Sequence, residues 1–178
     1  MKFLKSFKPI FFFILFCPLL ASQCEKPPED FEEKLPAITT EGKNTFGCRV
    51  NGEIWIPWIE FDLFDNHTTV SYHAPTGGVN ISTKKKIDDL DLFQAISFSS
   101  TDVKGIGEHE YNRADYRDYD TAFCESYRFE HDTILGNKFN ILKLDTENHI
   151  ISGTFEFTAI NDECDPVVIT DGRFDLGY

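Results

Sequence analysis

The sequence lacks the short motifs by which many enzymes are identified. Its 178 residues contain no HExxH pair, no CxxC or Cys/His zinc spacing, no GxSxG nucleophile motif, no Walker loop and no glycine-rich nucleotide fingerprint. We therefore expect no catalytic residues, no bound metal and no cofactor. A glycosidase needs only two carboxylates, but with 30 acidic residues to choose from, such a pair selects no particular site.

Basic residues are scarce. The chain has 17 Lys and Arg against 30 Asp and Glu, a formal charge of −13. Loss of residues 1–23 would remove three lysines and leave 14 bases against 30 acids, or −16. Such a charge repels nucleic acid and anionic lipid head groups. Nucleic acid is thereby excluded as a partner, whereas cations, basic peptides and neutral glycans remain open.

The N-terminus has the pattern of an export signal. Three lysines precede an apolar run, residues 10–20, which is shorter than the roughly 20 residues that span a bilayer and contains Pro18. The sequence Leu-Ala-Ser-Gln-Cys at residues 20–24 resembles a lipobox. We expect a signal peptide at residues 1–23 and lipidation of Cys24, which would bind the protein to a membrane. The alternative is an ordinary secretory peptide, with Cys24 left as a thiol.

The residues after Cys24 predict a spacer. Prolines and acidic residues dominate, and few apolar residues are present to pack. This composition favours a flexible tether, which we place at residues 24–43 together with the lipidated cysteine. One β domain is expected to follow at residues 44–178.

Within that domain, alternation of apolar and polar residues is the dominant pattern, and no long amphipathic helix is evident. The sequence predicts an all-β fold, either an antiparallel β-sandwich or a partly closed barrel of about nine strands. Asn51-Gly52 predicts a tight hairpin that sets Cys48 opposite Trp55. A phase change near Asp171-Gly172 predicts a β-bulge. The strands are expected at residues 45–51, 53–56, 68–73, 79–83, 92–99, 126–131, 139–144, 151–160 and 167–176, with a short helix at residues 86–93.

The cysteines are few enough to analyse individually. If Cys24 is lipidated, Cys48, Cys124 and Cys164 remain in the mature chain. Export to an oxidising space makes one disulfide reasonable. We expect it between Cys124 and Cys164, which lie in acidic, loop-like segments, while Cys48 packs as a buried thiol.

One segment combines tyrosines with aspartates, and we read it as a loop that contacts a ligand. Tyrosines that stack on sugar rings, with carboxylates on the hydroxyl groups, would suit a glycan, and the same carboxylates would suit Ca²⁺. The alternative is a solvated connection whose tyrosines lie over the edge of the core. The ligand-contact residues so predicted are Tyr111, Asp115, Tyr116, Asp118 and Tyr119. Near the C-terminus, Arg173 is expected to pair with Asp171 or Asp175.

Three segments carry a resemblance to a known family. They are residues 44–52 (NTFGCRVNG), 150–157 (IISGTFEF) and 169–175 (ITDGRFD). Together with the lipobox, they resemble a family of uncharacterised Bacteroidota lipoproteins known as a domain of unknown function. The resemblance implies a small β domain on a cell-envelope lipoprotein and supplies no catalytic residues.

These observations together predict a lipid-anchored protein of the cell envelope, at the outer membrane, on its surface or on its periplasmic side. We expect a non-enzymatic module that binds an envelope protein or a glycan. Two alternatives remain open. One is an extracellular hydrolase of a polymer, with two convergent carboxylates of raised pKa. The other is a structural component of the envelope.

Overall fold

A computed structural model describes residues 34–57, 67–87, 92–120, 123–129 and 137–178, which belong to one folded unit, Lys34–Tyr178. The described residues form strands, turns and loops and no helix, which confirms the expected all-β class. Among them, no helix is long and apolar enough to cross a membrane. The predicted signal peptide and Cys24 lie outside these residues.

The described residues form eleven strands, and all of their pairings are antiparallel. They are β1 (Thr45–Val50), β2 (Glu53–Trp55), β3 (Thr68–His73), β4 (Gly78–Ile87), β5 (Leu92–Ser100), β6 (Gly107–His109), β7 (Arg113–Asp118), β8 (Ser126–Phe129), β9 (Lys138–Asp145), β10 (Ile150–Asn161) and β11 (Cys164–Gly177).

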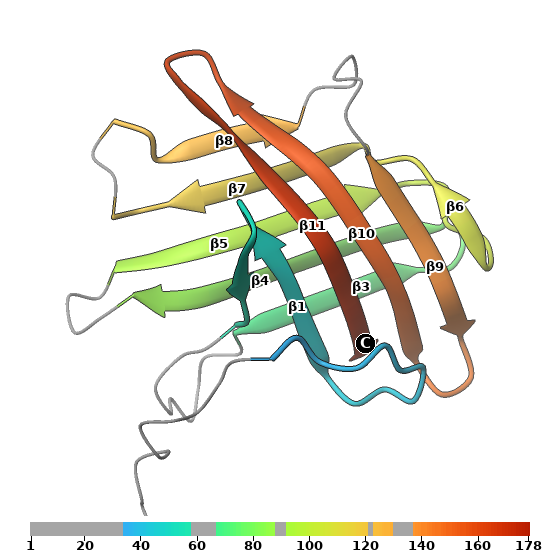
Figure 1. Cartoon of the computed structure of the whole chain (residues 1–178). Helices are drawn as coiled ribbons and strands as arrows, with labels where there is room; N and C mark the ends of the chain where they lie inside the picture. The colour runs from blue at the N-terminus through green and yellow to red at the C-terminus, as the bar shows by residue number, and fades with distance from the viewer. Residues whose placement is uncertain (1–33, 58–66, 88–91, 121–122, 130–136) are drawn as a thin grey trace, which may run out of the picture. The chain divides into compact units, whose positions relative to one another are not determined.

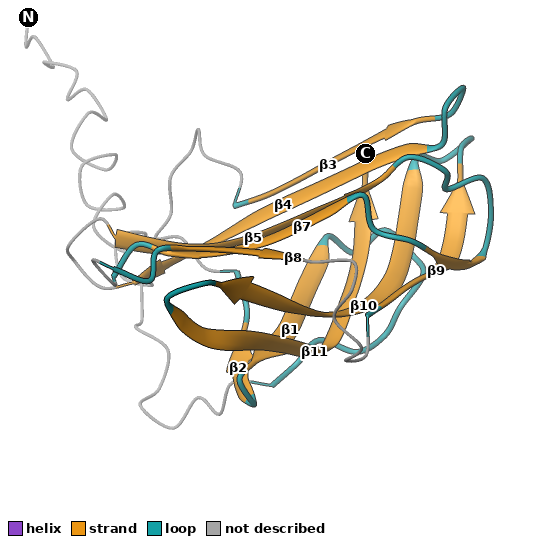
Figure 2. Ribbon diagram, turned by 90° about the horizontal axis from the view of Figure 1, so that it is seen from above, coloured by secondary structure: helices purple, strands orange, loops and turns teal. Residues whose placement is uncertain are grey.

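The sheet curls back over itself into two layers. Its continuous path runs β2-β1-β11-β10-β8-β7-β5-β4-β3. The long strand β10 pairs with β9 along its first part and with β8 near its end, so the sheet divides there. One layer holds β1, β11, β10 and β9, and the other holds β3, β4, β5, β7 and β8 (Figures 1 and 2). This half-barrel agrees with the expected antiparallel architecture.

Aromatic side chains fill the space between the layers. Phe98 of β5 lies 4.8 Å from Phe155 of β10 and 5.6 Å from Phe139 of β9, measured between ring centroids. Phe46 of β1 lies 5.0 Å from Phe155. Each of these rings is at most 4 % exposed. Burial of such rings is the main source of stability for the closed arrangement.

The predicted hairpin and bulge are both present. Asn51 and Gly52 have φ of 51° and 89°, as a type I′ turn requires, and Cys48 pairs with Trp55 as predicted. Between its neighbours β1 and β10, β11 has one extra residue near Thr170-Asp171-Gly172. The positive φ there (52°) belongs to Asp171. Gly172 is needed for another reason, because an added Cβ would collide with the carbonyl oxygen of Phe155.

Two sequence-based assignments in the middle of the domain are wrong. The segment read as an aromatic, acidic loop contains strand β7, whose polar residues obscured its alternation. The ends of the expected helix at residues 86–93 are strands, since β4 and β5 remain paired from Val79–Ser100 to Ile87–Leu92. Residues 88–91, and residues 130–131 of the expected strand 126–131, lie outside the described part of the chain.

The folded unit begins ten residues earlier than expected. Residues 34–43, assigned above to a flexible tether, are attached to β11 through Asp175. Its buried carboxylate accepts hydrogen bonds from the Thr39 hydroxyl (2.7 Å) and from the backbone N–H groups of Glu41 (2.9 Å), Gly42 (2.7 Å) and Lys43 (3.3 Å). These contacts between distant residues are invisible to an analysis of local composition.

The expected ion pair of Arg173 is also replaced by other contacts. Its guanidinium donates to the backbone carbonyls of Asp171 (3.0 Å) and Pro36 (3.4 Å). The Asp171 carboxylate lies 3.3 Å from Arg49 instead, and Asp175 holds the N-terminal segment. The bulge separates Asp171 from the rest of β11 and thus changes its partner.

The three cysteines among the described residues are arranged as predicted. Cys124 and Cys164 are joined by a disulfide, and Cys48 is a free, buried thiol. The disulfide links the segment before β8 to the start of β11. Burial raises the pKa of the Cys48 thiol, with a smaller opposing effect from Lys85, so Cys48 remains protonated and unreactive.

Candidate functional site

The five predicted ligand-contact residues do not form one cluster. Alternation along β7 directs Asp115 to the outside of its layer and Tyr116 and Asp118 to the inside. Tyr111 belongs to the core, where its hydroxyl donates to the backbone carbonyl of Lys138 at 2.6 Å. Tyr119 packs against Phe93, 4.5 Å between ring centroids. The interpretation of these residues as one ligand loop is therefore wrong.

Tyr116 and Asp118 belong to a hydrogen-bond network at one end of the half-barrel. The Trp55 indole N–H donates to Gln94 Oε1 (2.9 Å), and Gln94 Nε2 donates to Asp118 Oδ2 (3.0 Å). The Tyr116 hydroxyl donates to the same carboxylate oxygen (3.3 Å). Burial is the main cause that raises the pKa of Tyr116, and the nearby Asp118 carboxylate raises it further. A cavity of about 340 Å³ adjoins this network, and Lys85 and Glu53 also line the cavity.

This network has a structural role. Trp55 and Tyr116 are at most 3 % exposed, so their ring faces cannot stack on a ligand. The Asp118 carboxylate also accepts from the backbone N–H of Asp120 (3.1 Å) and is therefore well supplied with donors. The network fixes the orientation of β2, β5 and β7 relative to one another.

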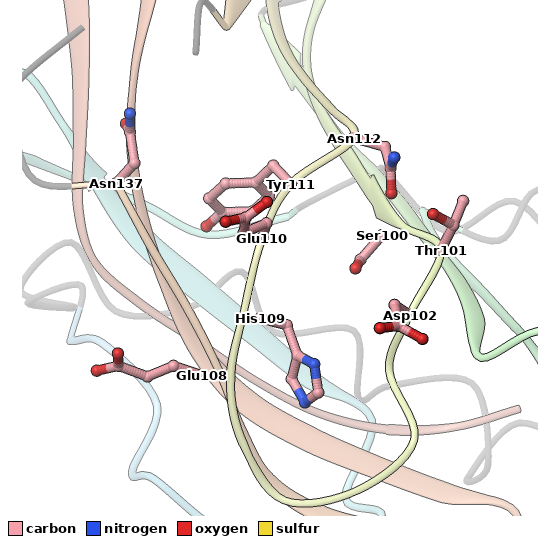
Figure 3. Close-up of a pocket in the computed structure, with 9 residues that line it drawn as sticks. All are labelled: Ser100, Thr101, Asp102, Glu108, His109, Glu110, Tyr111, Asn112 and Asn137. Atoms are coloured by element: carbon pink, nitrogen blue, oxygen red, sulfur yellow. The ribbon is translucent and has the colours of Figure 1, made fainter. Parts of the chain in front are cut away.

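A larger hollow, of about 570 Å³, lies beside β6 (Figure 3). Asp102 and His109 point to the same side of it, whereas Glu108 points to the other side of the strand (Figure 3). His109 Nε2 is 2.9 Å from the carbonyl of Gly105, and Asp102 pairs with Lys104 at 2.7 Å. Among the residues the structure describes, no group of three or more His, Cys, Asp or Glu side chains could hold a metal ion.

A third candidate site is the outward surface of the layer β3-β4-β5-β7-β8, which we call the outer face. In Figure 2 no described strand covers it. The strand register arranges its side chains in rows that cross the strands. One row is Thr69, Ser82, Ser97, Asp115 and Arg128, and the next is Ser71, Asn80, Ser99 and Arg113.

Small polar side chains make the middle of the outer face shallowly concave. A hollow of about 250 Å³ extends over β4, β5 and β7, with Ser82, Ser97 and Ser99 on its floor. No side-chain hydrogen bond of these three hydroxyls is found within the described part of the chain. Partly exposed hydroxyls without protein partners are available to hydrogen-bond a ligand.

The outer face is basic, although the chain as a whole is acidic. Arg113, Arg117 and Arg128 project from β7 and β8. Arg113 Nε lies 2.5 Å from the Asp115 carboxylate, and their side chains are 65 % and 6 % exposed, respectively. Asp115 is thus a buried support that orients an exposed guanidinium toward solvent.

Arg117 and Lys84 are the other basic residues of this region. Arg117 donates to the Tyr119 hydroxyl at 3.1 Å, which raises the pKa of Arg117, and the carboxylates of Asp115 and Glu125 add to that shift. On β4, the Lys84 ammonium lies 5.7 Å from the centroid of the Phe93 ring. Among the described side chains of the outer face, Arg113, Arg117, Arg128 and Lys84 are basic and Asp115 is acidic.

The sequence analysis did not identify the outer face, although one local pattern in the sequence indicates it. Ser97 and Ser99 alternate with the buried Ile96 and Phe98, and that pattern predicts one polar and one apolar side of a strand. Arg113 and Arg117 escaped notice because their strand was read as a loop, whereas Arg128 lies on a strand that was expected at residues 126–131. Asp115 was identified, although its role as a support for Arg113 was not.

Comparisons of the chain with protein-family models, with curated proteins and with solved structures found no match.

Proposed function

We propose that this protein is a lipid-anchored, non-enzymatic binding module of the bacterial cell envelope, held at the outer membrane through Cys24, that engages its partner through the outer face. The observation that carries the binding proposal is the combination of three arginines and a hydroxyl-lined hollow on a chain of formal charge −13. A concentration of one charge on a surface of the opposite sign favours a specific, complementary partner.

Export is supported by the cysteine chemistry. The Cys124–Cys164 disulfide suits an oxidising compartment, because cytosolic reductants keep most thiols reduced. The remaining cysteine of the folded unit, Cys48, is a free and buried thiol. Together with the signal-like N-terminus and the lipobox, these features favour an envelope lipoprotein related to the Bacteroidota family named above.

The carboxyl groups favour binding over hydrolysis. A glycosidase-like hydrolase requires an acid whose pKa is raised. In the described residues, hydrogen bonds or nearby cations lower the pKa of three carboxyl groups. These belong to Asp102, Asp145 and Asp175. Carboxylates of lowered pKa stay ionised and do not act as general acids at neutral pH.

The anchor is tested by metabolic labelling with an alkyne fatty acid and by fractionation of the cells. The wild-type chain should incorporate the label and sediment with membranes, whereas Cys24→Ala should do neither and should remain folded. Cys17→Ala is the matched control, since that residue is expected to leave with the signal peptide. An unlabelled wild-type chain, or a Cys24→Ala chain that still carries lipid, would contradict the proposed anchor.

A further inference from the structure

We infer that the outer face binds an acidic polysaccharide, with the carboxylate groups of the sugar chain on Arg113, Arg117 and Arg128 and the sugar hydroxyls over the serine-lined hollow. This inference rests on the proposed binding function and names its ligand class. It reverses the expectation from net charge, because the average over the chain conceals the basic sign of this one face.

The arginines are spaced to receive charges that are separated along a chain. Arg113 and Arg117 are four residues apart on β7, which corresponds to about 13 Å along an extended strand. Arg128 on β8 pairs with Asp115, midway between them. A guanidinium binds a carboxylate through two parallel hydrogen bonds, so the three arginines can each hold one carboxylate of an extended polymer.

The hollow beside the arginines matches the uncharged part of such a polymer. Hydroxyls of Ser82, Ser97 and Ser99 form its floor, and the amide of Asn80 lies at its margin. Hydroxyls and amides both donate and accept hydrogen bonds, as sugar hydroxyls do. The hollow covers β4, β5 and β7, so the uncharged groups of a sugar chain that follows β7 can lie over it while its carboxylates face the arginines.

Other anionic partners fit less well. Double-stranded nucleic acid carries one charge per roughly 1.7 Å, and its phosphates would also meet the acidic remainder of the protein. A membrane surface is too flat to reach the recessed serines. A protein interface normally has an apolar centre. The large apolar side chains exposed in the described part of the chain are Ile38, Ile106, Phe123 and Val168, and none of them lies on the outer face.

The test is binding of the full chain, purified in detergent, to three carboxylated polysaccharides: polygalacturonate, alginate and hyaluronate. Methyl-esterified polygalacturonate is the matched ligand control, because it keeps the sugar backbone and loses the charge. We expect at least one acidic polymer to bind and the ester to bind at least tenfold more weakly. Binding should also weaken as salt concentration rises.

Protein variants locate the contact. Arg113→Gln and Arg128→Gln should each weaken binding about three- to tenfold. Ser97→Val, which leaves every charge in place, should also weaken it by filling the hollow. Arg49→Gln is the matched control, since Arg49 lies on β1 and pairs with Asp171, and its affinity should equal that of the wild type. Thermal unfolding of each variant verifies that it is folded.

Several results would overturn the inference. These are no binding to any of the three acidic polymers, equal binding of the ester, or equal losses for Arg49→Gln and Arg113→Gln. Stronger binding of the Cys24→Ala chain, which has no lipid to insert, to phosphatidylglycerol vesicles than to the polymers would also overturn it. Lipidation is measured separately, so a lipidated chain that binds no acidic polysaccharide refutes this inference and leaves the anchor standing. A chain that binds the polymer but carries no lipid refutes the anchor alone.

Discussion

The carboxylate of Asp175 accepts a 2.7 Å hydrogen bond from the hydroxyl of Thr39, a residue 136 positions earlier in the chain. The backbone N–H groups of residues 41–43 donate to the same carboxylate. The last strand thereby fixes the segment that connects the β domain to its predicted anchor. Residues 34–43 therefore belong to the folded unit and are not part of a flexible tether.

Replacement of Asp175 should destabilise the protein. Asp175→Asn removes the charge and directs amide hydrogens at groups that are themselves donors. We expect the free energy of unfolding to fall by about 2 to 4 kcal/mol, as for other buried, charge-assisted hydrogen bonds. Asp171→Asn is the matched control on the same strand, with an exposed ion pair worth less than about 1 kcal/mol. Urea unfolding measures both changes, and equal losses would contradict the role assigned to Asp175.

Stability should depend on pH through the same residue. Burial raises the pKa of Asp175, but the hydrogen bonds from Thr39 and residues 41–43 outweigh it and leave the pKa below its ordinary value. This contribution is therefore complete above the unfolded pKa of about 4 and is lost as pH falls through the folded value. The wild type should lose stability between pH 5 and low pH more steeply than Asp175→Asn. Parallel pH profiles from urea unfolding would refute this linkage.

Gly172 should tolerate no side chain. An added Cβ would meet the carbonyl oxygen and ring of Phe155, so Gly172→Ala should cost about 2 to 3 kcal/mol through overpacking. At Gly105, a Cβ would have nothing within 4 Å, and Gly105→Ala should change stability by less than about 0.5 kcal/mol. Thermal unfolding compares the two variants. A melting temperature unchanged in Gly172→Ala would show that β11 can move away from β10.

Thiol counting tests the cysteine assignments together. The native full chain should take up no N-ethylmaleimide, because Cys48 is buried with a raised pKa and Cys24 is expected to carry lipid. Unfolding without reductant should expose one thiol, and unfolding with reductant should expose three. Intact-mass spectrometry reports each number. One label on the native chain would mean that either Cys24 is unmodified or Cys48 is accessible.

The disulfide should also contribute to stability. It links residues 40 positions apart, and a closed loop of that length is expected to stabilise the fold by about 3 to 4 kcal/mol. The paired variant Cys124→Ser/Cys164→Ser should unfold at correspondingly lower urea concentration. A midpoint equal to that of the wild type would contradict this and would show that the disulfide adds no net stability.

The parts of the fold that the sequence predicted are those with local causes. The Asn51-Gly52 turn requires positive φ at both residues, and that requirement alone sets Cys48 opposite Trp55. The bulge near Asp171 was visible as a change of phase within one strand. Strand β7 was missed because Asp115 and Arg117, on its outward side, resemble the charged residues of a loop.

The site depended on relationships that no local pattern contains. Ser97, Asp115 and Arg128 come from three strands, and only the pairing register places them in one row. Net charge does not reveal the basic outer face for the same reason, since it averages that face with the rest of the chain. The predicted ligand residues failed as a group because alternation along one strand sends Asp115 and Tyr116 to opposite sides.

The most direct test of the central claim is arginine footprinting in the native envelope. Intact cells and the purified full chain are treated with phenylglyoxal, and the modification rate of each arginine is read by mass spectrometry. If the outer face is the binding surface, Arg113, Arg117 and Arg128 should react more slowly in cells than in the purified chain, while Arg49 and Arg173 react at unchanged rates. Equal ratios at all five arginines would contradict the account.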